Sequence, residues 1–485
     1  MNLLRMPVLL SCIAFPSLLL SQQPTSDLKK AADQLSASVY NGPVLTTLSE
    51  LADGIGGRLT GSPPYVRSTE WAVAKFRSYG IENVRLEPFT IPAGWERGVA
   101  SGAIVSPLPR SLNLASMGWA PSTPAGGVQA EVIKIADLEP EALRSREESI
   151  KGKIVYLDTT KIYADGYGKA IPKMEAAWKT FQRVGVKAVI MSDREKNNVL
   201  NAHGALWGAR LLPLPAVEVG MEDSKLIERD LERGPLTVQI TVENKSSGEK
   251  KVNNVIAEIR GSERPDEWLL IGAHLDSWDF GTGTQDNGTG AVSVIDVGRA
   301  LMAIGKPPRR SIRLALWGGE EQGLLGSYAY TQSHKAELSK CIAVLNTDNG
   351  AGHPKGWKVE GREDLKKALE PLSNGLLKDL GGAEISMSTS YDTDHGPFML
   401  EGIPALDLYV DMTKYMEIHH KSSDTLDKVD VIDLKAGEAI VAVTAYAIAQ
   451  SDAAIAPHID HAAVSEILKK AKLDDMVTNV GIWKP

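Results

Sequence analysis

The sequence predicts an α/β protein in which a mixed, largely parallel central sheet is flanked by helices and interrupted by an inserted smaller unit. From Asn254 onward, short apolar runs alternate with helical patterns, which is typical of βαβ units. Between about 125 and 246, further β-rich runs with their own helical patterns form a second group. The length of 485 residues exceeds that of one ordinary domain. Together these observations favour a large α/β domain that carries an inserted unit.

The periods of the apolar residues assign the elements in chain order. Helical spacing is predicted over residues 27–45, 44–51, 69–79, 173–183, 223–233, 291–304, 324–333, 365–380 and 434–450. Strand-type runs are predicted over residues 83–88, 128–135, 152–157, 186–191, 236–242, 255–259, 269–273, 312–317 and 342–345. The segment 107–123 is rich in Pro, Ser and Gly and is expected to be a linker or boundary.

The N-terminus has the pattern of a secretory signal peptide. Residues 1–5 are short and positive, residues 6–20 are almost wholly apolar, and residues 21–26 turn polar. The apolar run is shorter than the roughly 20 residues that a membrane-spanning helix needs. We therefore expect a secreted or periplasmic protein with no membrane span. A lipoprotein cleavage box at Leu9-Leu-Ser-Cys12 is the alternative.

Five segments follow from these boundaries. They are a signal peptide (1–21), the N-terminal part of the catalytic domain (22–120), an inserted domain (121–248), the catalytic domain proper (249–455) and a C-terminal tail (456–485).

The composition narrows the class of partner. Hydrophobic residues make up 43% and charged residues 24% of the chain, as in soluble globular proteins. The net charge of -8, from 53 basic and 61 acidic residues, argues against binding to nucleic acid or an anionic membrane. Removal of the signal peptide with Cys12 would leave Cys341 alone, so the fold cannot depend on an intrachain disulfide.

Metal-binding residue types cluster at the ends of predicted strands. His274 closes one apolar run, Glu320-Glu321 follow the next, and Asp348 follows a third. Asp286 and His420 complete the set. Imidazole and carboxylate without thiolate suit zinc or another borderline divalent ion in a catalytic site. Two His and three carboxylates exceed the needs of one tetrahedral ion with an open position and suit two ions sharing a carboxylate.

These motifs resemble a family in their order along the chain. His274-Leu-Asp276, Asp286-Asn287, Glu320-Glu321, the Asp348 turn and His420 with Asp424-Thr425 are similar to the two-zinc exopeptidases that include aminopeptidases and glutamate carboxypeptidases. The resemblance covers residues 254–450 and a helical N-terminal segment at about 45–118. It implies the zinc exopeptidase fold and two zinc ions. The middle unit resembles a protease-associated domain.

The resemblance also implies roles for individual residues. Asp286 would bridge the two ions, His274 and Asp348 would hold one, and Glu321 and His420 the other. Glu320 would take a proton from the bridging water and pass it to the leaving amine. Asp276 would accept the second ring N–H of His274.

Two assignments depend on softer patterns. In the family that the chain resembles, the last ligand lies four residues before the acid of an Asp-Thr pair. Here that acid is Asp424, so the resemblance selects His420 over His419 as the ligand. His395 or Tyr391, near Thr393-Asp-His-Gly-Pro-Phe398, is a candidate to stabilise the oxyanion, with a structural loop as the alternative.

The function expected from this resemblance is a secreted zinc-dependent exopeptidase that hydrolyses dipeptides or short peptides with a metal-activated bridging water. A catalytically silent, receptor-like protein on the same scaffold is one alternative, and a two-metal hydrolase of another bond is a further one. The sequence does not decide between aminopeptidase, carboxypeptidase and dipeptidase. The resemblance suggests a homodimer.

Overall fold

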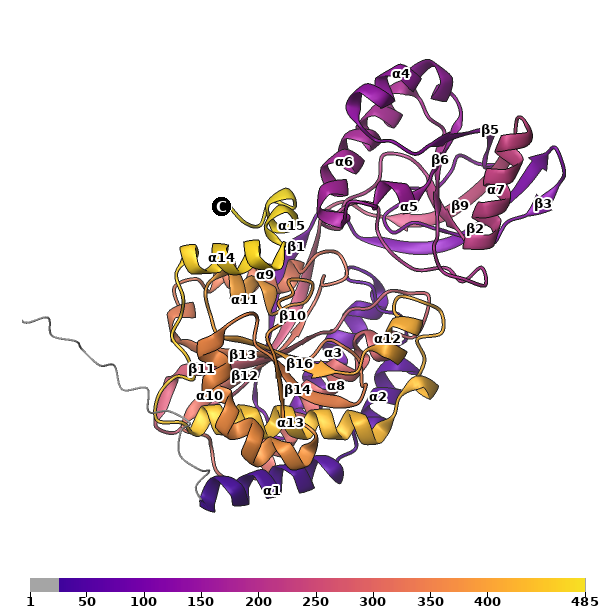
Figure 1. Ribbon diagram of the computed structural model, residues 1–485. Helices are drawn as coiled ribbons and strands as arrows, with labels where there is room; N and C mark the ends of the chain where they lie inside the picture. Colours follow the sequence, from indigo (N-terminus) through magenta and orange to yellow (C-terminus); the bar gives the residue numbers. More distant parts are fainter. Residues whose placement is uncertain (1–25, 485) are drawn as a thin grey trace, which may run out of the picture.

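The computed structural model describes residues 26–484, which form a larger and a smaller body (Figure 1). The predicted signal peptide and Cys12 lie outside the described residues. The chain crosses into the smaller body after β1 (Asn83–Ile91) and returns through the turn before β10 (Lys250–Ile259).

The larger body is built on an eight-stranded mixed sheet. In spatial order its strands are β1, β10, β12 (Arg310–Trp317), β11 (Arg264–His274), β13 (Cys341–Asn346), β16 (Ala405–Val410), β14 (Pro354–Lys358) and β15 (Glu384–Ser386). The four central strands, β12, β11, β13 and β16, are parallel to one another. The predicted mixed, largely parallel sheet is therefore confirmed.

Both faces of this sheet are buried. Successive side chains of β11 point alternately to one face and to the other. Leu269, Ile271 and Ala273 enter one apolar core, whereas Trp268 and Leu270 enter another on the opposite face. The first core is completed by α1 (Ser26–Tyr40), α2 (Val44–Ala52), α3 (Pro63–Ser78), α8 (Thr289–Ala303), α10 (Glu363–Leu372) and α13 (Val431–Gln450). The second core receives side chains from α9 (Leu325–Ser333) and α11 (Gly396–Leu400). Strands buried on both faces read as near-continuous apolar runs, which is why the sequence revealed them.

The smaller body carries a second eight-stranded sheet. Its order is β3 (Arg110–Ser111), β2 (Trp95–Ser106), β9 (Thr237–Ser246), β5 (Val128–Ile135), β6 (Ile154–Leu157), β7 (Ala188–Ser192), β8 (Ala216–Val219) and β4 (Leu114–Ser116). Its helices are α4 (Pro140–Ile150), α5 (Thr159–Ile162), α6 (Tyr167–Val184) and α7 (Met221–Arg233).

This sheet corrects the expected start of the insertion. We expected residues up to 120 to belong to the catalytic part, with 107–123 as a linker, but β2, β3 and β4 all join the second sheet. β2 pairs along its length with β9. Most of its side chains are exposed or half-buried, so the strand lacks the apolar alternation that would have marked it.

The C-terminal segment returns to the smaller body through α14 (His461–Ala471) and α15 (Asp474–Asn479), which lies beside α6 (Figure 1). Asn479 donates its side-chain amide to the carbonyl of Gly168 at 2.9 Å. None of the helices in residues 26–484, including the long helix α13, is both long enough and apolar enough to cross a bilayer.

Candidate metal centre

The predicted ligands meet at the carboxyl edge of the central parallel strands. His274 is the last residue of β11 and pairs in register with Trp317, the last residue of β12. Glu320 and Glu321 follow in the turn after β12, and Asp348 follows the end of β13. Since parallel neighbours end at one edge, three strands deliver their acidic or imidazole groups to one place.

Asp286 lies between two imidazole rings. Its Oδ1 is 3.2 Å from Nε2 of His274, and its Oδ2 is 3.2 Å from Nε2 of His420. Each ring also faces a second carboxylate: Oδ1 of Asp348 is 3.1 Å from His274, and Oε2 of Glu321 is 3.1 Å from His420. The arrangement is two imidazole–carboxylate pairs that share Asp286.

These groups are close enough to hold metal ions. Three clusters have ligand atoms within 4.8 Å of one another: Asp286 with His419 and His420, His274 with Glu320 and Asp348, and His274 with Asp286 and Glu321. Oδ2 of Asp286 is buried and accepts no hydrogen bond from the described residues. A buried carboxylate oxygen that only imidazoles face, within a cluster of imidazole and carboxylate ligand atoms at these separations, fits a divalent cation such as zinc.

The electrostatics of the centre show an excess of negative charge. Although burial lowers it, Glu321 and Asp286 raise the pKa of His420 to about 10. Burial, reinforced by Asp286, raises the pKa of Glu321 to about 7. Burial likewise raises the pKa of Asp348 to about 6. Imidazoles that retain protons and carboxylates that resist ionisation both indicate a site that bound cations would stabilise.

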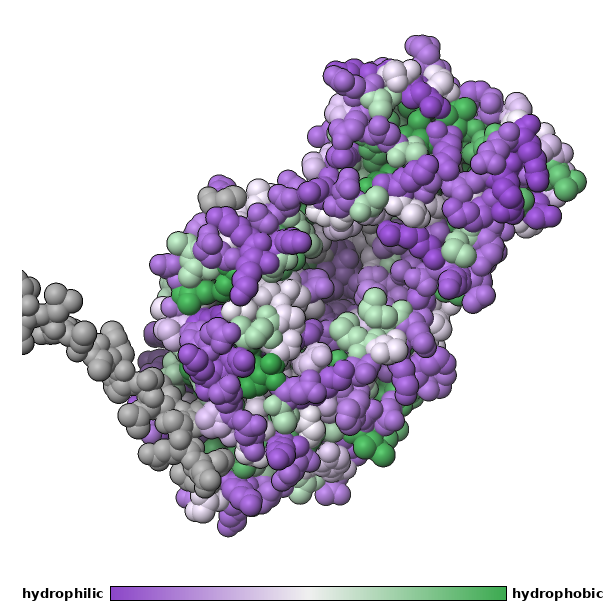
Figure 2. Space-filling view, viewed as in Figure 1, coloured by the Kyte–Doolittle hydropathy of each residue, from purple (hydrophilic) through white to green (hydrophobic). Residues whose placement is uncertain are grey.

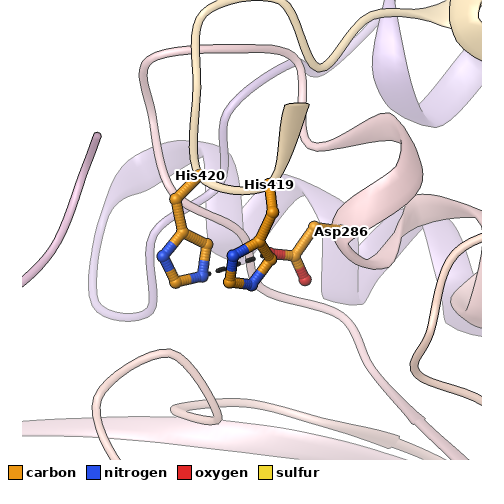
Figure 3. Close-up of side chains that lie close together, drawn as sticks. All are labelled: Asp286, His419 and His420. Carbon is orange, nitrogen blue, oxygen red and sulfur yellow. Dashed lines mark ion pairs between the residues drawn. The ribbon is translucent and has the colours of Figure 1, made fainter. Parts of the chain in front are cut away.

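His419 is also directed at the shared carboxylate. Figure 3 shows its ring beside that of His420, with both facing Asp286. The ring centroids are 3.7 Å apart, and Nε2 of His419 is 3.4 Å from Oδ2 of Asp286. His420 has a φ of 60°, a left-handed conformation that costs a non-glycine residue on the order of 1 kcal/mol. Burial and the neighbouring His420 lower the pKa of His419 to about 4, so its ring is neutral near pH 7.

Glu320 borders the cluster. Its Oε2 is 3.8 Å from Nε2 of His274, and its side chain keeps 12% of its surface exposed. Burial, with added repulsion from Asp348, raises its pKa well above its usual range. By contrast, Glu321 accepts the backbone N–H of Trp278 at 3.0 Å.

Asp276 contacts His274 mainly through its backbone. Nδ1 of His274 is 2.9 Å from the carbonyl oxygen of Asp276 and 3.6 Å from its carboxylate. The Asp276 carboxylate instead accepts the backbone N–H of Glu320 at 3.3 Å. Asp276 therefore connects the turn after β11 with the turn that carries Glu320.

His395 lies outside the wall of the site. Its ring is fully buried, with Nδ1 2.5 Å from the hydroxyl of Thr393 and Nε2 3.4 Å from Glu360. Thr393 borders the cavity described below, whereas His395 and Tyr391 do not. This position does not suit direct contact with an oxyanion, and His395 instead supports Thr393.

Two residues that sequence reasoning gave no role hold the turns of the centre. The buried guanidinium of Arg58 donates to the carbonyls of Leu275 and Thr282 and to that of Gly283 at 2.8 Å. Asp424 accepts the backbone N–H groups of Gln285 and Asp286. Arg58 follows two glycines in a predicted loop, a signal too common to single it out.

The centre opens into a cavity of about 840 Å³ between the two bodies. Figure 2 shows the surface hollowed where they meet. Its wall includes Asp286, Glu320 and His420 from the larger body and Arg194, His203 and Trp207 from the smaller. Substrate bound at the centre would therefore contact both bodies.

Comparison with known proteins places the chain in a family. The sequence pattern of peptidase family M28 matches residues 254–445. Carboxypeptidase Q from Bos taurus is 31% identical over 406 residues, covering 83% of this chain and 84% of that protein. A probable lipoprotein aminopeptidase from Mycobacterium tuberculosis is 28% identical over 428 residues, covering 80% of each.

A solved structure agrees over most of the chain. The peptidase M28 precursor from Shewanella amazonensis is 29% identical and superposes with a TM-score of 0.77, covering 90% of this chain and 99% of that one. The predicted resemblance, which pointed most closely to carboxypeptidase Q, is thereby confirmed. The chain belongs to peptidase family M28 and is a zinc metallopeptidase.

Proposed function

We propose that the protein is an exported exopeptidase that hydrolyses dipeptides or short peptides at a centre of two zinc ions. The proposed ligands are His274, Asp286, Glu321, Asp348 and His420. The observation that carries the proposal is the position of Asp286, whose two oxygens each face a separate imidazole at 3.2 Å. A carboxylate shared in this way would suit a centre that holds two ions.

The bound ions would supply two effects, a lower pKa for water and polarisation of the scissile carbonyl. The protein provides the proton transfers. Glu320 faces the cluster without an imidazole at bonding distance, so its carboxylate can accept a proton from the water and then release it to the leaving amine. Asp276 fixes the backbone of Glu320 and thereby its position relative to His274.

The smaller body fits the role of a protease-associated-type domain, and we propose that it forms one wall of the substrate site. Export is supported by the signal pattern at residues 1–21. Anchoring as a lipoprotein at Cys12 is the alternative, and the mycobacterial relative, a probable lipoprotein aminopeptidase, is consistent with it.

A panel of peptides tests the proposal. Free, N-blocked and C-blocked forms of one dipeptide are incubated with purified protein, with a chelator, and with zinc added back. We expect metal-dependent hydrolysis of the free dipeptide. Hydrolysis that persists after complete zinc removal would contradict the proposal, and the blocked forms reveal which terminus the site requires.

A further inference from the structure

A loop of the smaller body, residues 193–203, is fixed directly to the segment that carries His420. Ala202 donates its backbone N–H to the carbonyl of His420 at 2.8 Å. Asn201 forms a β-bridge with Lys421, and Nζ of Lys421 is 2.8 Å from Oε2 of Glu195. These contacts hold the loop in a defined position relative to the metal centre.

The side chain of Asp193 stabilises the backbone of the same loop. Its carboxylate accepts the backbone N–H groups of Arg194 at 2.5 Å, Glu195 at 2.8 Å and Asn201 at 2.8 Å. Hydrogen bonds to a carboxylate are stronger than those between neutral groups, so the backbone that carries Arg194 is preorganised.

Arg194 differs in charge from the rest of the cavity wall. Among the described residues that line the cavity, it is the only arginine or lysine. The acidic residues of the wall are Asp193, Glu195, Asp286, Glu320, Glu321, Asp348 and Asp392. These acids would disfavour a substrate carboxylate over much of the cavity, whereas Arg194 and bound cations would attract it.

The guanidinium of Arg194 is available for a ligand. Its side chain makes no ion pair with any carboxylate in residues 26–484, although its two neighbours in the chain are acidic. The carboxylate of Asp193 is engaged by the loop backbone and that of Glu195 by Lys421. The guanidinium lies 5.7 Å from the ring centroid of Tyr163, which supports it from one side.

We propose that Arg194 binds the free C-terminal carboxylate of the peptide, so that the smaller body selects substrates by this group. The inference rests on the proposed peptidase function, and it identifies the C-terminal carboxylate as the group of the substrate that the protein recognises. A guanidinium can donate two parallel N–H bonds to a carboxylate, a geometry that an amide terminus cannot reproduce.

The test compares one dipeptide with its C-terminal amide. In Arg194→Gln, we expect the KM of the free dipeptide to rise at least tenfold while kcat stays within threefold. The KM of the amide, or its inhibition constant where turnover is slow, should change less than threefold. Arg194→Lys should recover part of the loss. Lys196→Gln, an exposed residue of the same loop outside the cavity, is the matched control and should affect neither peptide.

Binding without turnover separates this inference from the proposed function. Calorimetry on zinc-loaded Glu320→Gln, with and without Arg194→Gln, gives the affinities of the free dipeptide and the amide directly. A selective loss of affinity for the free dipeptide supports the role of Arg194 even if the protein hydrolyses neither peptide. Equal losses for both peptides, or no loss for the free dipeptide, would overturn it.

Discussion

The carboxylate of Asp424 accepts the backbone N–H of Asp286 at 3.2 Å, across 138 residues of sequence. Its other oxygen accepts the N–H of Gln285 at 2.7 Å. Asp424 therefore orients the turn that presents the shared carboxylate, while His420 and Lys421 lie a few residues before it in the chain. A single segment thus supplies one predicted ligand and positions another.

Replacing Asp424 with Asn should weaken zinc binding without removing a ligand. The amide group can accept only one of the two N–H bonds and directs its own donor at the other. Groups that orient metal ligands typically contribute 10–100-fold to affinity, and we expect a loss in that range. Competition with a fluorescent chelator measures it. Asp427→Asn, an exposed acid nearby, is the control, and an equal loss there would refute the positioning role.

The two adjacent histidines should differ in their effect on metal content. His420 faces both Glu321 and Asp286, whereas the ion pairs of His419 include Asp286 alone. We expect His420→Ala to lose about one of two zinc ions per chain and His419→Ala to retain both, as measured by atomic emission. The reverse pattern would show that the ligand is His419.

A buried acid on α13 should make the stability of the protein pH-dependent. Burial, with the nearby Asp296, raises the pKa of Glu438 well above its usual range. The unfolded state releases this proton above about pH 4.3, whereas the folded state keeps it up to its own higher pKa. Between these two pKa values, the free energy of unfolding therefore falls as pH rises. Each unit of pKa difference corresponds to about 1.4 kcal/mol.

Glu438→Gln removes this dependence. We expect its melting temperature, relative to the wild type, to be higher at pH 8 than at pH 4.5. The cost of burying the amide is the same at both pH values and cancels in the comparison. Glu370→Gln, an exposed residue of α10, is the control. A difference between Glu438→Gln and wild type that does not vary with pH would contradict the prediction.

The sequence predicted those features that depend on local pattern. The buried strands that end at His274, Trp317 and Asn346 have continuous apolar runs, and the acidic and imidazole residues after them follow a recognisable order. The structure brings all five predicted ligands together with Glu320. Their roles at the metal ions stay predictions.

The features that sequence analysis missed depend on contacts between distant segments. The contact of Ala202 with His420, and the carbonyls that Arg58 binds, have no local signature. β2 escaped detection because most of its side chains are exposed or half-buried, so no apolar alternation marks the strand, and only its pairing with the distant β9 defines it. The buried position of His395 likewise depends on Glu360, which no spacing rule connects to it.

The most direct test of the two-zinc mechanism compares two neighbouring glutamates. Glu320→Gln should retain the zinc content of the wild type and lose about 10²–10⁴-fold in kcat, because it removes only the proton carrier. Glu321→Gln should lose zinc. Metal analysis and steady-state kinetics on both variants measure this. A Glu320→Gln protein that holds zinc and turns over within threefold of the wild type would contradict the account.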